Sequence, residues 1–389
     1  MRVLLLNDAA APAGGAEILT YDLRDGLRER GHDARVFASD ALGPGPADYG
    51  CHGTTGRLRT LNRAANPRAA WRLRGVLREF RPDVVHVRMF LTQLSPLILP
   101  LLRDVPALYH AAWYEMICPT GLKLLPDGRV CREPAGRACL RCLSPPAWVA
   151  LMGQRALVDR WRGVFGLYVA NSDTTRRRLE EHGIGPVIRI WNGVPARPAR
   201  PPLADPPTVA YSGRLSREKG VETLAEAFLA VAERIPRARL RLVGDGPLRA
   251  DLERRLAAPI ADGRAEVTGW LPRDAAERAM DAAWVQAVPS LLEEPFGTAA
   301  AEALMRGTAV VASDGGGPAE VVGASGGGLL VPPGDPAALA DAIAGLLGDR
   351  DRAEALGAAG RAWAADRLAR ERCVDAFLEA YRTVVEAGP

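Results

Sequence analysis

The sequence contains almost no lysine, no long apolar run and no strong excess of charge of either sign. Of its 50 basic residues only Lys123 and Lys219 are lysines, so both positions are candidates for specific roles. The longest apolar stretch, Phe90 to Leu102, is interrupted by Gln93 and Pro96 and cannot supply the roughly 20 apolar residues that cross a bilayer. The formal net charge of +4 over 389 residues does not call for a nucleic-acid partner.

A secretory signal is also missing from the start of the sequence. The apolar run Val3–Leu6 ends at Asn7 and is too short for the apolar region of a signal peptide, and no cleavage site follows. We therefore expect a cytoplasmic protein whose cysteines are reduced. With 48% hydrophobic and 25% charged residues, the composition is that of ordinary globular domains.

Short apolar runs alternate with segments of helical periodicity along the whole chain, which predicts α/β domains with mostly parallel sheets. The predicted strands are Val3–Leu6, Arg35–Ala38, Val84–Val87, Leu167–Ala170, Val209–Ser212, Leu240–Val243, Val285–Val288 and Ala309–Ala312. A proline-rich stretch from Asn192 to Pro207 lacks hydrophobic periodicity and marks a domain boundary. We predict one domain over residues 1–193, a linker over 194–207, a second domain over 208–360 and a final helical segment over 361–389.

The glycine fingerprint of dinucleotide-binding domains is missing from both halves. The residues after the first predicted strand, Asn7 to Glu17, form a long loop without Gly-x-Gly-x-x-Gly. In the second half Gly244 and Gly246 begin the pattern, but Arg249 stands where the third glycine belongs. Both departures weaken the interpretation as a pyridine-nucleotide oxidoreductase.

The segment EEPFGTAAAEAL places two glutamates, Glu294 and Glu302, on either side of a predicted helix start. The alanines favour a helix and Thr298 is a good N-cap, so amides around Gly297 would point toward a bound diphosphate. Glu294 could then accept hydrogen bonds from sugar hydroxyls, and Glu302, a little over one turn into the helix, could bind a ribose diol. Two isolated glutamates would more often be ordinary surface acids, so the interpretation depends on the surrounding residues.

The segment SGRLSREKG, after the strand that ends at Ser212, supplies two further candidates. Arg214 and Lys219 lie near the start of the next helix, and two cations suit a departing diphosphate. The compact ammonium of Lys219 can act as a point charge on phosphate. A solvated basic loop is the alternative.

Together these segments resemble the donor-site signature of glycosyltransferase family 4. The resemblance rests on Glu294–Thr298, Glu302–Leu304 and Gly307–Ser313 with the glycine-rich turn that follows, and it extends over most of the chain. It implies the GT-B fold, with two Rossmann-like doubly wound domains facing across a cleft. The first domain would bind the acceptor and the second the nucleotide sugar, and the final helix, 361–389, would return to the first domain.

The resemblance also implies roles for single residues. Arg214 and Lys219 would bind the pyrophosphate without a catalytic metal, Glu294 would contact the donor sugar and Glu302 the ribose. Other donor contacts, mainly through backbone groups, would come from Gly14, Gly15, Leu271, Phe296, Gly297 and Thr298. His110 would contact the donor sugar, although Ala111 replaces the aspartate that follows this histidine in relatives.

The implied activity is a retaining glycosyl transfer from a nucleotide diphosphate sugar, with UDP favoured over GDP. No carboxylate suggests itself as a covalent nucleophile, and the family is thought to use same-face attack, with the leaving phosphate helping to deprotonate the acceptor. The acceptor is not identified, and both natural-product tailoring and cell-envelope glycan assembly fit. A nucleotide-sugar epimerase of similar build and an inactive nucleotide-binding scaffold are the alternatives.

Four cysteines, Cys118, Cys131, Cys139 and Cys142, lie in one segment rich in glycine, proline and arginine. A Cys-x-x-Cys pair with two more cysteines, in a loop that cannot build its own core, is typical of a structural zinc site. Zinc is favoured over two disulfides in a reducing compartment, and unliganded thiols are the third alternative. Relatives carry a similar insertion, so we expect residues 118–142 to shape the acceptor side.

The segment from Arg57 to Arg81 carries eight arginines and one acid, Glu79. Its apolar residues at helical spacing are Ala69, Leu73, Val76, Leu77 and Phe80. A core-packed helix with a solvated arginine face is the favoured interpretation. Contact with the anionic inner face of a membrane is the alternative.

Overall fold

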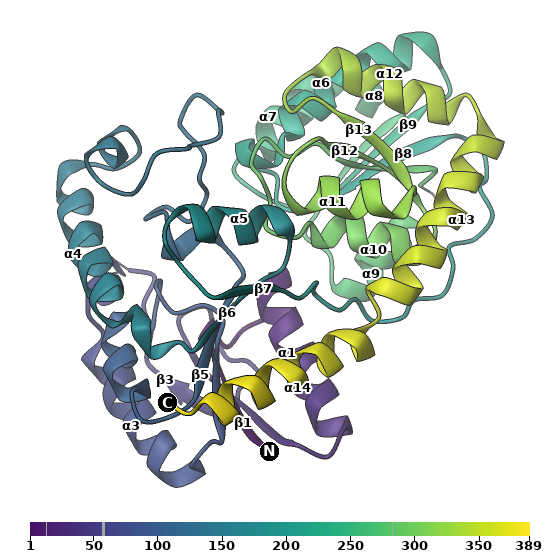
Figure 1. The fold of residues 1–389 in the computed structure, drawn as a ribbon. Coiled ribbons are helices and arrows are strands. Elements are labelled where there is room, and N and C mark those ends of the chain that lie inside the picture. Colours follow the sequence, from purple (N-terminus) through teal and green to yellow (C-terminus); the bar gives the residue numbers. More distant parts are fainter. Residues whose placement is uncertain (13, 57–58, 282) are drawn as a thin grey trace. The chain divides into compact units, whose positions relative to one another are not determined.

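The computed structural model describes residues 1–12, 14–56, 59–281 and 283–389. The chain divides into two compact units, each a parallel β-sheet flanked by helices (Figure 1). Unit 1 contains Met1–Pro126, Cys131–Pro195 and Arg370–Pro389, and unit 2 contains Asp127–Val130 and Ala196–Ala369. This is the α/β architecture that the alternating apolar runs predict.

Unit 1 is built on a seven-stranded sheet in the order β3-β2-β1-β4-β5-β6-β7. Its strands are β1 (Arg2–Ala9), β2 (Asp33–Ser39), β3 (Tyr49–Cys51), β4 (Val84–Val87), β5 (Ala107–Ala111), β6 (Leu167–Ala170) and β7 (Val187–Arg189). Its α-helices are α1 (Gly15–Glu29), α2 (Arg59–Ala64), α3 (Pro67–Phe80), α4 (Pro145–Trp161), α5 (Asp173–Glu181) and α14 (Arg370–Ala387). Short 3₁₀ turns are η1 (Pro96–Leu102), η2 (Tyr114–Met116), η3 (Arg137–Arg141) and η4 (Arg162–Val164).

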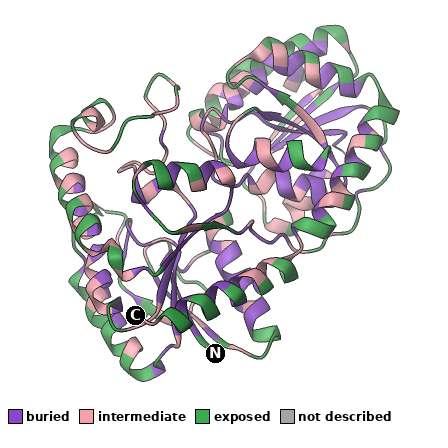
Figure 2. Ribbon diagram, in the orientation of Figure 1, coloured by how far each residue is buried: buried purple, intermediate pink, exposed green. Residues whose placement is uncertain are grey.

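The core of unit 1 lies on both faces of this sheet, so its central strands are buried (Figure 2). Along β1, Leu4 and Leu6 join a cluster with α3, whereas Val3 and Leu5 join a cluster with α1 and α14. Helix α14 contributes Val374, Phe377, Leu378 and Tyr381, which recur at helical spacing and bury one face of the helix. The last helix of the chain is therefore part of the core of unit 1.

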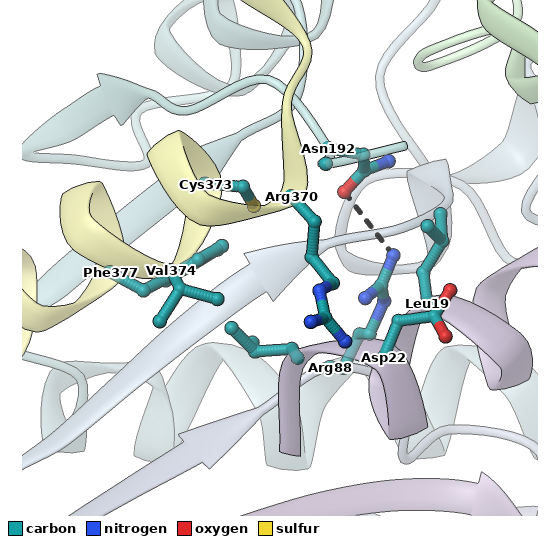
Figure 3. Close-up of a pocket in the computed structure, with 10 residues that line it drawn as sticks. Leu19, Asp22, Arg88, Asn192, Arg370, Cys373, Val374 and Phe377 are labelled. Carbon is teal, nitrogen blue, oxygen red and sulfur yellow. Dashed lines mark hydrogen bonds between the residues drawn. The ribbon is translucent and has the colours of Figure 1, made fainter. Parts of the chain in front are cut away.

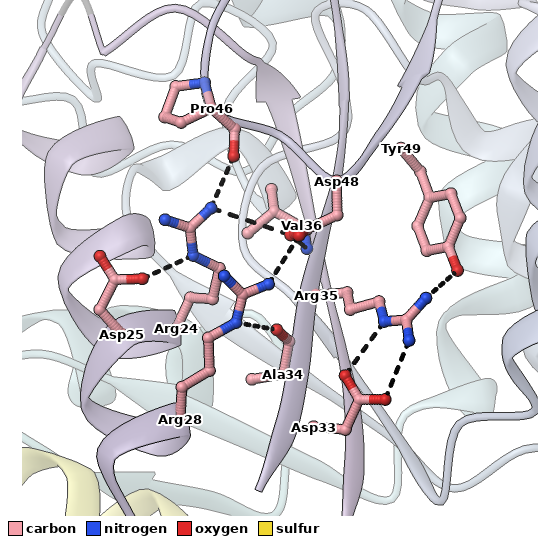
Figure 4. Close-up of polar contacts among 10 residues, drawn as sticks. All are labelled: Arg24, Asp25, Arg28, Asp33, Ala34, Arg35, Val36, Pro46, Asp48 and Tyr49. Carbon is pink, nitrogen blue, oxygen red and sulfur yellow. Dashed lines mark hydrogen bonds and ion pairs between the residues drawn. The ribbon is translucent and has the colours of Figure 1, made fainter.

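Polar contacts fix the short strand β3 and the chain that leads into it (Figure 4). One carboxylate oxygen of Asp48 accepts from Arg28 Nη2 at 2.6 Å, and the other accepts from the Val36 amide at 2.8 Å. Arg35 bonds Asp33 at 3.0 Å on one side and the Tyr49 hydroxyl at 2.7 Å on the other. These bonds satisfy groups at the sheet edge that β3 alone is too short to cover.

Unit 2 is built on a six-stranded sheet in the order β10-β9-β8-β11-β12-β13. Its strands are β8 (Thr208–Ser212), β9 (Arg239–Val243), β10 (Ala265–Gly269), β11 (Val285–Val288), β12 (Ala309–Ser313) and β13 (Gly328–Val331). Its helices are η5 (Arg217–Lys219), α6 (Val221–Arg234), α7 (Arg249–Arg255), α8 (Ala257–Ala261), α9 (Arg273–Met280), α10 (Thr298–Arg306), α11 (Gly316–Ser325), α12 (Pro336–Leu347) and α13 (Arg350–Arg367). Ligands bind such sheets where the strand order reverses, here between β8 and β11.

Two segments differ in detail from the sequence-based expectation. Part of the predicted linker 194–207 packs on unit 2, where Arg200 Nη2 donates to Glu354 Oε2 at 2.7 Å and Arg200 Nε donates to the Gly307 carbonyl at 3.0 Å. The predicted final segment 361–389 is divided, because α13 ends at Arg367 in unit 2 and α14 begins at Arg370 in unit 1. Among the described residues, no helix has both the length and the apolarity needed to cross a bilayer.

Candidate functional site

The loops that follow β8 and β11 meet at the carboxyl edge of the unit 2 sheet. The two strands are neighbours, with Val209 paired to Val285. Their loops are tied together where the Leu291 amide donates to the Glu218 carbonyl at 3.0 Å. Gly220 has a φ of 66°, and a Cβ at this position would lie 1.8 Å from the Pro289 carbonyl oxygen, so only glycine fits there. The two loops are thus held in a fixed arrangement.

This arrangement brings Lys219 and Glu294 together. Lys219 Nζ lies 2.9 Å from Glu294 Oε2, and the Ser290 hydroxyl donates to the other carboxylate oxygen. Burial alone would raise the pKa of Glu294, but the Lys219 charge and the two hydrogen bonds outweigh it and lower that pKa below its usual value. Glu294 is therefore an ionised acceptor, and Lys219 keeps 21% of its side chain exposed for a further anion.

The N-terminus of α10 directly follows this acid. Gly297 is the N-cap with a φ of 82°, and Thr298 is the first helical residue. The prediction of Thr298 as the N-cap is therefore wrong by one position, because the left-handed turn into the helix requires a glycine. The glycine-rich turn that begins α11 packs against the loop, where the Gly317 amide donates to the Glu294 carbonyl at 2.7 Å. The first amides of α10 lack intrahelical partners, as at any helix start.

Glu302 lies on α10, one turn after the helix start. Its carboxylate is 3.9 Å from Arg273 Nη2, and 42% of its side chain is exposed. Arg273 is also bonded to Glu277 at 3.2 Å, so the arginine is positioned from two sides. Glu302 can still accept hydrogen bonds from a diol.

The two remaining donor-site candidates of unit 2 follow β8 and β10. The side chain of Arg214 is exposed, and its carbonyl accepts a 2.8 Å hydrogen bond from the buried hydroxyl of Tyr211. Leu271 packs against Ala210 and Met280, which leaves its backbone for any ligand contact. Arg214, Lys219, Leu271, Phe296, Gly297, Thr298 and both glutamates all follow the carboxyl ends of strands in one sheet.

The predicted glycines of unit 1 occupy the turn after β1. Strand β1 runs to Ala9, farther than predicted, and Gly14 is the N-cap of α1 with Gly15 as its first residue. A Cβ on Gly14 would lie 2.8 Å from Glu17 Oε2, so the carboxylate of Glu17 lies close to the helix start. Burial raises the pKa of Glu17 above its usual value.

His110 lies in a different environment from the one that the sequence suggested. It is inside β5 and 0% exposed, with its ring 5.0 Å from that of Phe377 and 5.3 Å from that of His86. Neither of its ring nitrogens has a hydrogen-bond partner among the described residues. Burial lowers the pKa of His110 well below its usual value. This environment does not support a direct contact with a sugar, and that role stays a prediction.

A buried arginine in unit 1 is a feature that the sequence interpretation missed. Arg88 follows β4, is 3% exposed and lines a cavity with Asn192, Arg370 and Cys373 (Figure 3). Its Nη2 donates to Asn192 Oδ1 at 3.4 Å, which is a long bond, and burial lowers its pKa to about 10. Its place directly after the predicted strand Val84–Val87 was the available signal. In unit 2 the same kind of signal could have pointed to Ser290, which comes soon after β11.

The four clustered cysteines are free and partly exposed, and all four line one cavity. Burial, followed by the charges of the other three sulfurs, raises the pKa of the Cys142 thiol. Across the described part of the chain, however, no three His, Cys, Asp or Glu side chains are arranged to hold a metal ion. The structure brings these cysteines to one place without forming a ligand set, and zinc stays a prediction.

The arginine-rich segment forms α2 and α3, while Arg57 lies outside the described residues. The apolar positions of α3 pack inward, with Ala69, Leu73, Val76 and Phe80 buried and Leu77 partly buried. The favoured interpretation of a core-packed helix agrees with this burial. The opposite face is exposed and includes Trp71, at 72%.

Two family models match consecutive parts of the chain. The model described as Glycosyltransferase Family 4 matches residues 13–197, and the model described as Glycosyl transferases group 1 matches residues 196–363. Their common boundary lies next to the division between the two units, at Pro195 and Ala196.

Curated relatives are similar over part of their length. The 2-deoxystreptamine glucosyltransferase of Streptomyces kanamyceticus is 35% identical over 179 residues, which is 46% of each chain. The GDP-mannose-dependent alpha-(1-6)-phosphatidylinositol monomannoside mannosyltransferase of Mycobacterium tuberculosis is 37% identical over 169 residues, 41% of this chain and 43% of the relative. The matches thus span less than half the length of these relatives.

Solved structures match the whole chain. Sucrose-phosphate synthase from Thermosynechococcus elongatus superimposes with a TM-score of 0.75 at 24% identity and covers 100% of both chains. Anabaena HepE in complex with UDP and glucose gives a TM-score of 0.69 at 21% identity, covering 98% of this chain and 99% of the other. At these identities the likeness establishes the fold, which is GT-B.

Proposed function

Because the chain belongs to glycosyltransferase family 4, we propose that it transfers a sugar from a nucleotide diphosphate sugar to an acceptor, with retention of the anomeric configuration. The observation that carries the proposal is the Lys219–Glu294 pair at the carboxyl ends of β8 and β11. A cation and an ionised carboxylate there, beside a helix N-terminus, suit a ligand that carries both a diphosphate and sugar hydroxyls.

In this proposal unit 2 binds the donor. Lys219 and Arg214 neutralise the pyrophosphate as the bond to the sugar breaks, so that no catalytic metal is needed. Glu294 accepts hydrogen bonds from the sugar, and Glu302 accepts them from the ribose. The amides of Gly297 and Thr298 contact phosphate, and Phe296 contacts the sugar. The backbone of Leu271 contacts the nucleobase.

The reaction leaves little covalent chemistry for the protein. The acceptor oxygen attacks the anomeric carbon on the face from which the diphosphate departs, and a phosphate oxygen takes the acceptor proton. Positioning and charge stabilisation by Lys219 and Arg214 then supply most of the rate enhancement. In unit 1, Gly14 and Gly15 would approach the donor phosphate or the acceptor, and His110 would act only if its surroundings open.

The names of the relatives and structural neighbours include both UDP and GDP donors. HepE has been solved with UDP-glucose, whereas the mycobacterial mannosyltransferase is named for GDP-mannose. We favour a UDP-sugar. For the acceptor, relatives named for 2-deoxystreptamine favour natural-product tailoring. The relative named for phosphatidylinositol monomannoside supports the alternative, cell-envelope glycan assembly.

A cytoplasmic location with contact to the inner membrane face belongs to the envelope alternative. Its support is the exposed face of α3, where Arg68, Arg72, Arg74 and Arg78 accompany Trp71. Such a face can lie on anionic lipid. Sedimentation with anionic vesicles, compared between the native chain and a Trp71→Ala variant, tests this contact.

Thermal unfolding with UDP, GDP, ADP and NAD, first in EDTA and then with Mg²⁺, tests the donor site. A ligand at a hundredfold excess over its Kd stabilises the folded chain by about 2.7 kcal/mol, so the shift is measurable. We expect a shift with UDP in EDTA that is lost in Lys219→Met and kept in Arg217→Met. No shift with any diphosphate, or a shift with NAD alone, would overturn the proposal.

A product assay then separates transfer from epimerisation. An epimerase converts the nucleotide sugar without an acceptor and releases no nucleoside diphosphate. Slow release of UDP from UDP-glucose, increased by a correct acceptor, is the expected result.

A further inference from the structure

The loop between η2 and α4 has almost no core of its own. Between Cys118 and Cys142 the one buried residue among those described is Lys123. The apolar side chains of the loop are partly or largely exposed, as for Leu140 at 46%. Its only helical element is the short turn η3. A segment of this length without apolar burial needs another source of order, commonly a metal or disulfides.

Backbone turns bring the four cysteines of this loop to one cavity. The Gly121 amide donates to the Cys118 carbonyl at 2.9 Å, and the Cys142 amide donates to the Cys139 carbonyl at 3.0 Å. The Cys131 amide donates to the Lys123 carbonyl at 2.7 Å, which folds the middle of the loop back on itself. Cys118, Cys131, Cys139 and Cys142 line the resulting cavity with Leu124 and Leu125, which provide an apolar wall.

Lys123 anchors this arrangement to unit 1. Its side chain is 2% exposed, and its Nζ donates to the Glu133 carbonyl at 2.8 Å and lies 3.3 Å from His182 Nε2 at the end of α5. The residue has a φ of 51°, a conformation that a lysine adopts only when its surroundings hold it there. Trp148 Nε1 of α4 also donates to the Gly136 carbonyl at 2.8 Å. These polar contacts hold the loop at its margins, whereas the cavity between them is lined by the sulfurs.

We propose that Cys118, Cys131, Cys139 and Cys142 together bind one Zn²⁺ that takes the place of a core in this loop. Because no three of these side chains are arranged as a ligand set among the described residues, binding requires the four sulfurs to come closer together across the cavity that they line. The four thiols lose their protons to solvent as the four Zn–S bonds form, each about 2.3 Å long. With four protein ligands the ion has no open position, so it is structural and takes no part in sugar transfer. This inference does not depend on the proposed function.

Metal analysis of the chain purified in reducing buffer tests the site. We expect about one zinc per chain, consistent with a closed four-cysteine site. The zinc content should fall at least tenfold in Cys139→Ser and in Cys142→Ser. The matched control is Cys51→Ser, which alters a free cysteine outside the loop and should keep the metal. Iron with visible absorption, or two disulfides in the loop by mass spectrometry, would overturn the proposal.

A second measurement needs no variant and so is independent of folding defects. Thiol alkylation of the native chain, mapped by peptide, should spare the four loop cysteines until a strong chelator is added. Hydrogen exchange in residues 118–142 should rise on chelation while exchange in β1 and β8 is unchanged. Equal alkylation with and without chelator, together with no uptake of added Zn²⁺, would show that the cysteines are plain thiols.

Discussion

Lys219 Nζ lies 2.9 Å from Glu294 Oε2, and the pair joins the loops after two neighbouring strands, β8 and β11. The ammonium is the main cation that keeps the Glu294 carboxylate ionised. One residue therefore provides charge for a phosphate and sets the protonation of the acid beside it.

Replacing Lys219 by methionine should lower kcat/KM for transfer by about 10²–10³-fold, the usual loss for one donor to a developing charge. It should also raise the pKa of Glu294, because burial is then opposed only by Ser290, so the acid limb of the pH–rate profile moves to higher pH. Arg217→Met, an exposed change in the same turn, is the control. An unchanged rate in Lys219→Met would remove this residue from the mechanism.

Gly316→Ala should damage the donor site more than it damages the fold. Gly316 has a φ of 66°, and a Cβ there would lie 2.5 Å from the Glu294 carbonyl oxygen, so the Glu294 loop must move. Gly326→Ala is a matched control, since Gly326 has a φ of 59° with nothing within 4 Å of its Cβ position. In both variants the alanine must adopt a left-handed backbone conformation, which lowers the stability of the fold by about 1–2 kcal/mol.

Donor affinity distinguishes the two glycine variants. By isothermal titration, we expect a Kd for UDP at least tenfold weaker in Gly316→Ala and unchanged in Gly326→Ala. Equal affinities in the two variants would mean that the glycine-rich turn does not position Glu294.

The sequence predicted the sheets well and the polar pairings poorly. Buried strands such as β12, in which Ala309–Ala312 reads AVVA, are continuous apolar runs, which sequence patterns detect, whereas β3 and β7 are three-residue edge strands with exposed residues. The apolar stretch Phe90 to Leu102 forms a loop and η1 within the core of unit 1, where side chains such as Leu94 and Ile98 are buried.

Contacts within the site depend on strand order, which the sequence does not state. Glu294 was predicted from its helix start, but its bond to Lys219 follows from β8 and β11 being neighbours. His110 was expected to contact the donor sugar, but its ring packs against Phe377 of α14, the last helix of the chain. The family resemblance identified candidate residues such as Glu294 and His110, but it could not predict which side chains would pack around them.

Acid should destabilise unit 1 through its two buried histidines, His86 and His110. Burial lowers both pKa values well below the usual 6.5, so the folded chain keeps these rings neutral. Below pH 6.5 the unfolded chain binds more protons than the folded chain, so stability falls as pH falls, by about 1.4 kcal/mol per pH unit for each histidine.

Denaturant unfolding at several pH values between about 5 and 7 measures this slope. Buried Glu115, whose pKa is raised to about 8, opposes this slope in both chains. His110→Phe removes a ring that has no hydrogen-bond partner among the described residues, so its slope should be smaller than that of the native chain by about 1.4 kcal/mol per pH unit. His52→Gln, at an exposed position, should leave it unchanged. An identical slope in native and His110→Phe chains would contradict the assignment.

Arg200, in the predicted linker segment, should stabilise unit 2 through its contacts with Glu354 and Gly307. Its side chain is 4% exposed, and the guanidinium donates to Glu354 at 2.7 Å and to the Gly307 carbonyl at 3.0 Å. Arg200→Met should lower the free energy of unfolding by about 2–3 kcal/mol, because the Gly307 carbonyl then loses a partner. Arg234→Met, which removes an exposed pair with Asp341, should cost under about 0.5 kcal/mol. A similar loss in both variants would mean that the buried contacts add nothing.

Lys123→Met should loosen the cysteine-rich loop and leave the donor site intact. The methionine keeps most of the buried stem but loses the 2.8 Å bond to the Glu133 carbonyl within the loop and the 3.3 Å contact with His182 Nε2, which joins the loop to the end of α5. Hydrogen exchange in residues 118–142 should increase severalfold, while UDP still raises the unfolding temperature as in the native chain. Lys219→Met should give the opposite result, with a protected loop and no response to UDP. Since these are the only two lysines, the two variants also show whether each lysine serves one unit alone. Loss of the UDP response in Lys123→Met would mean that the loop and the donor site are coupled, contrary to the separation that we infer.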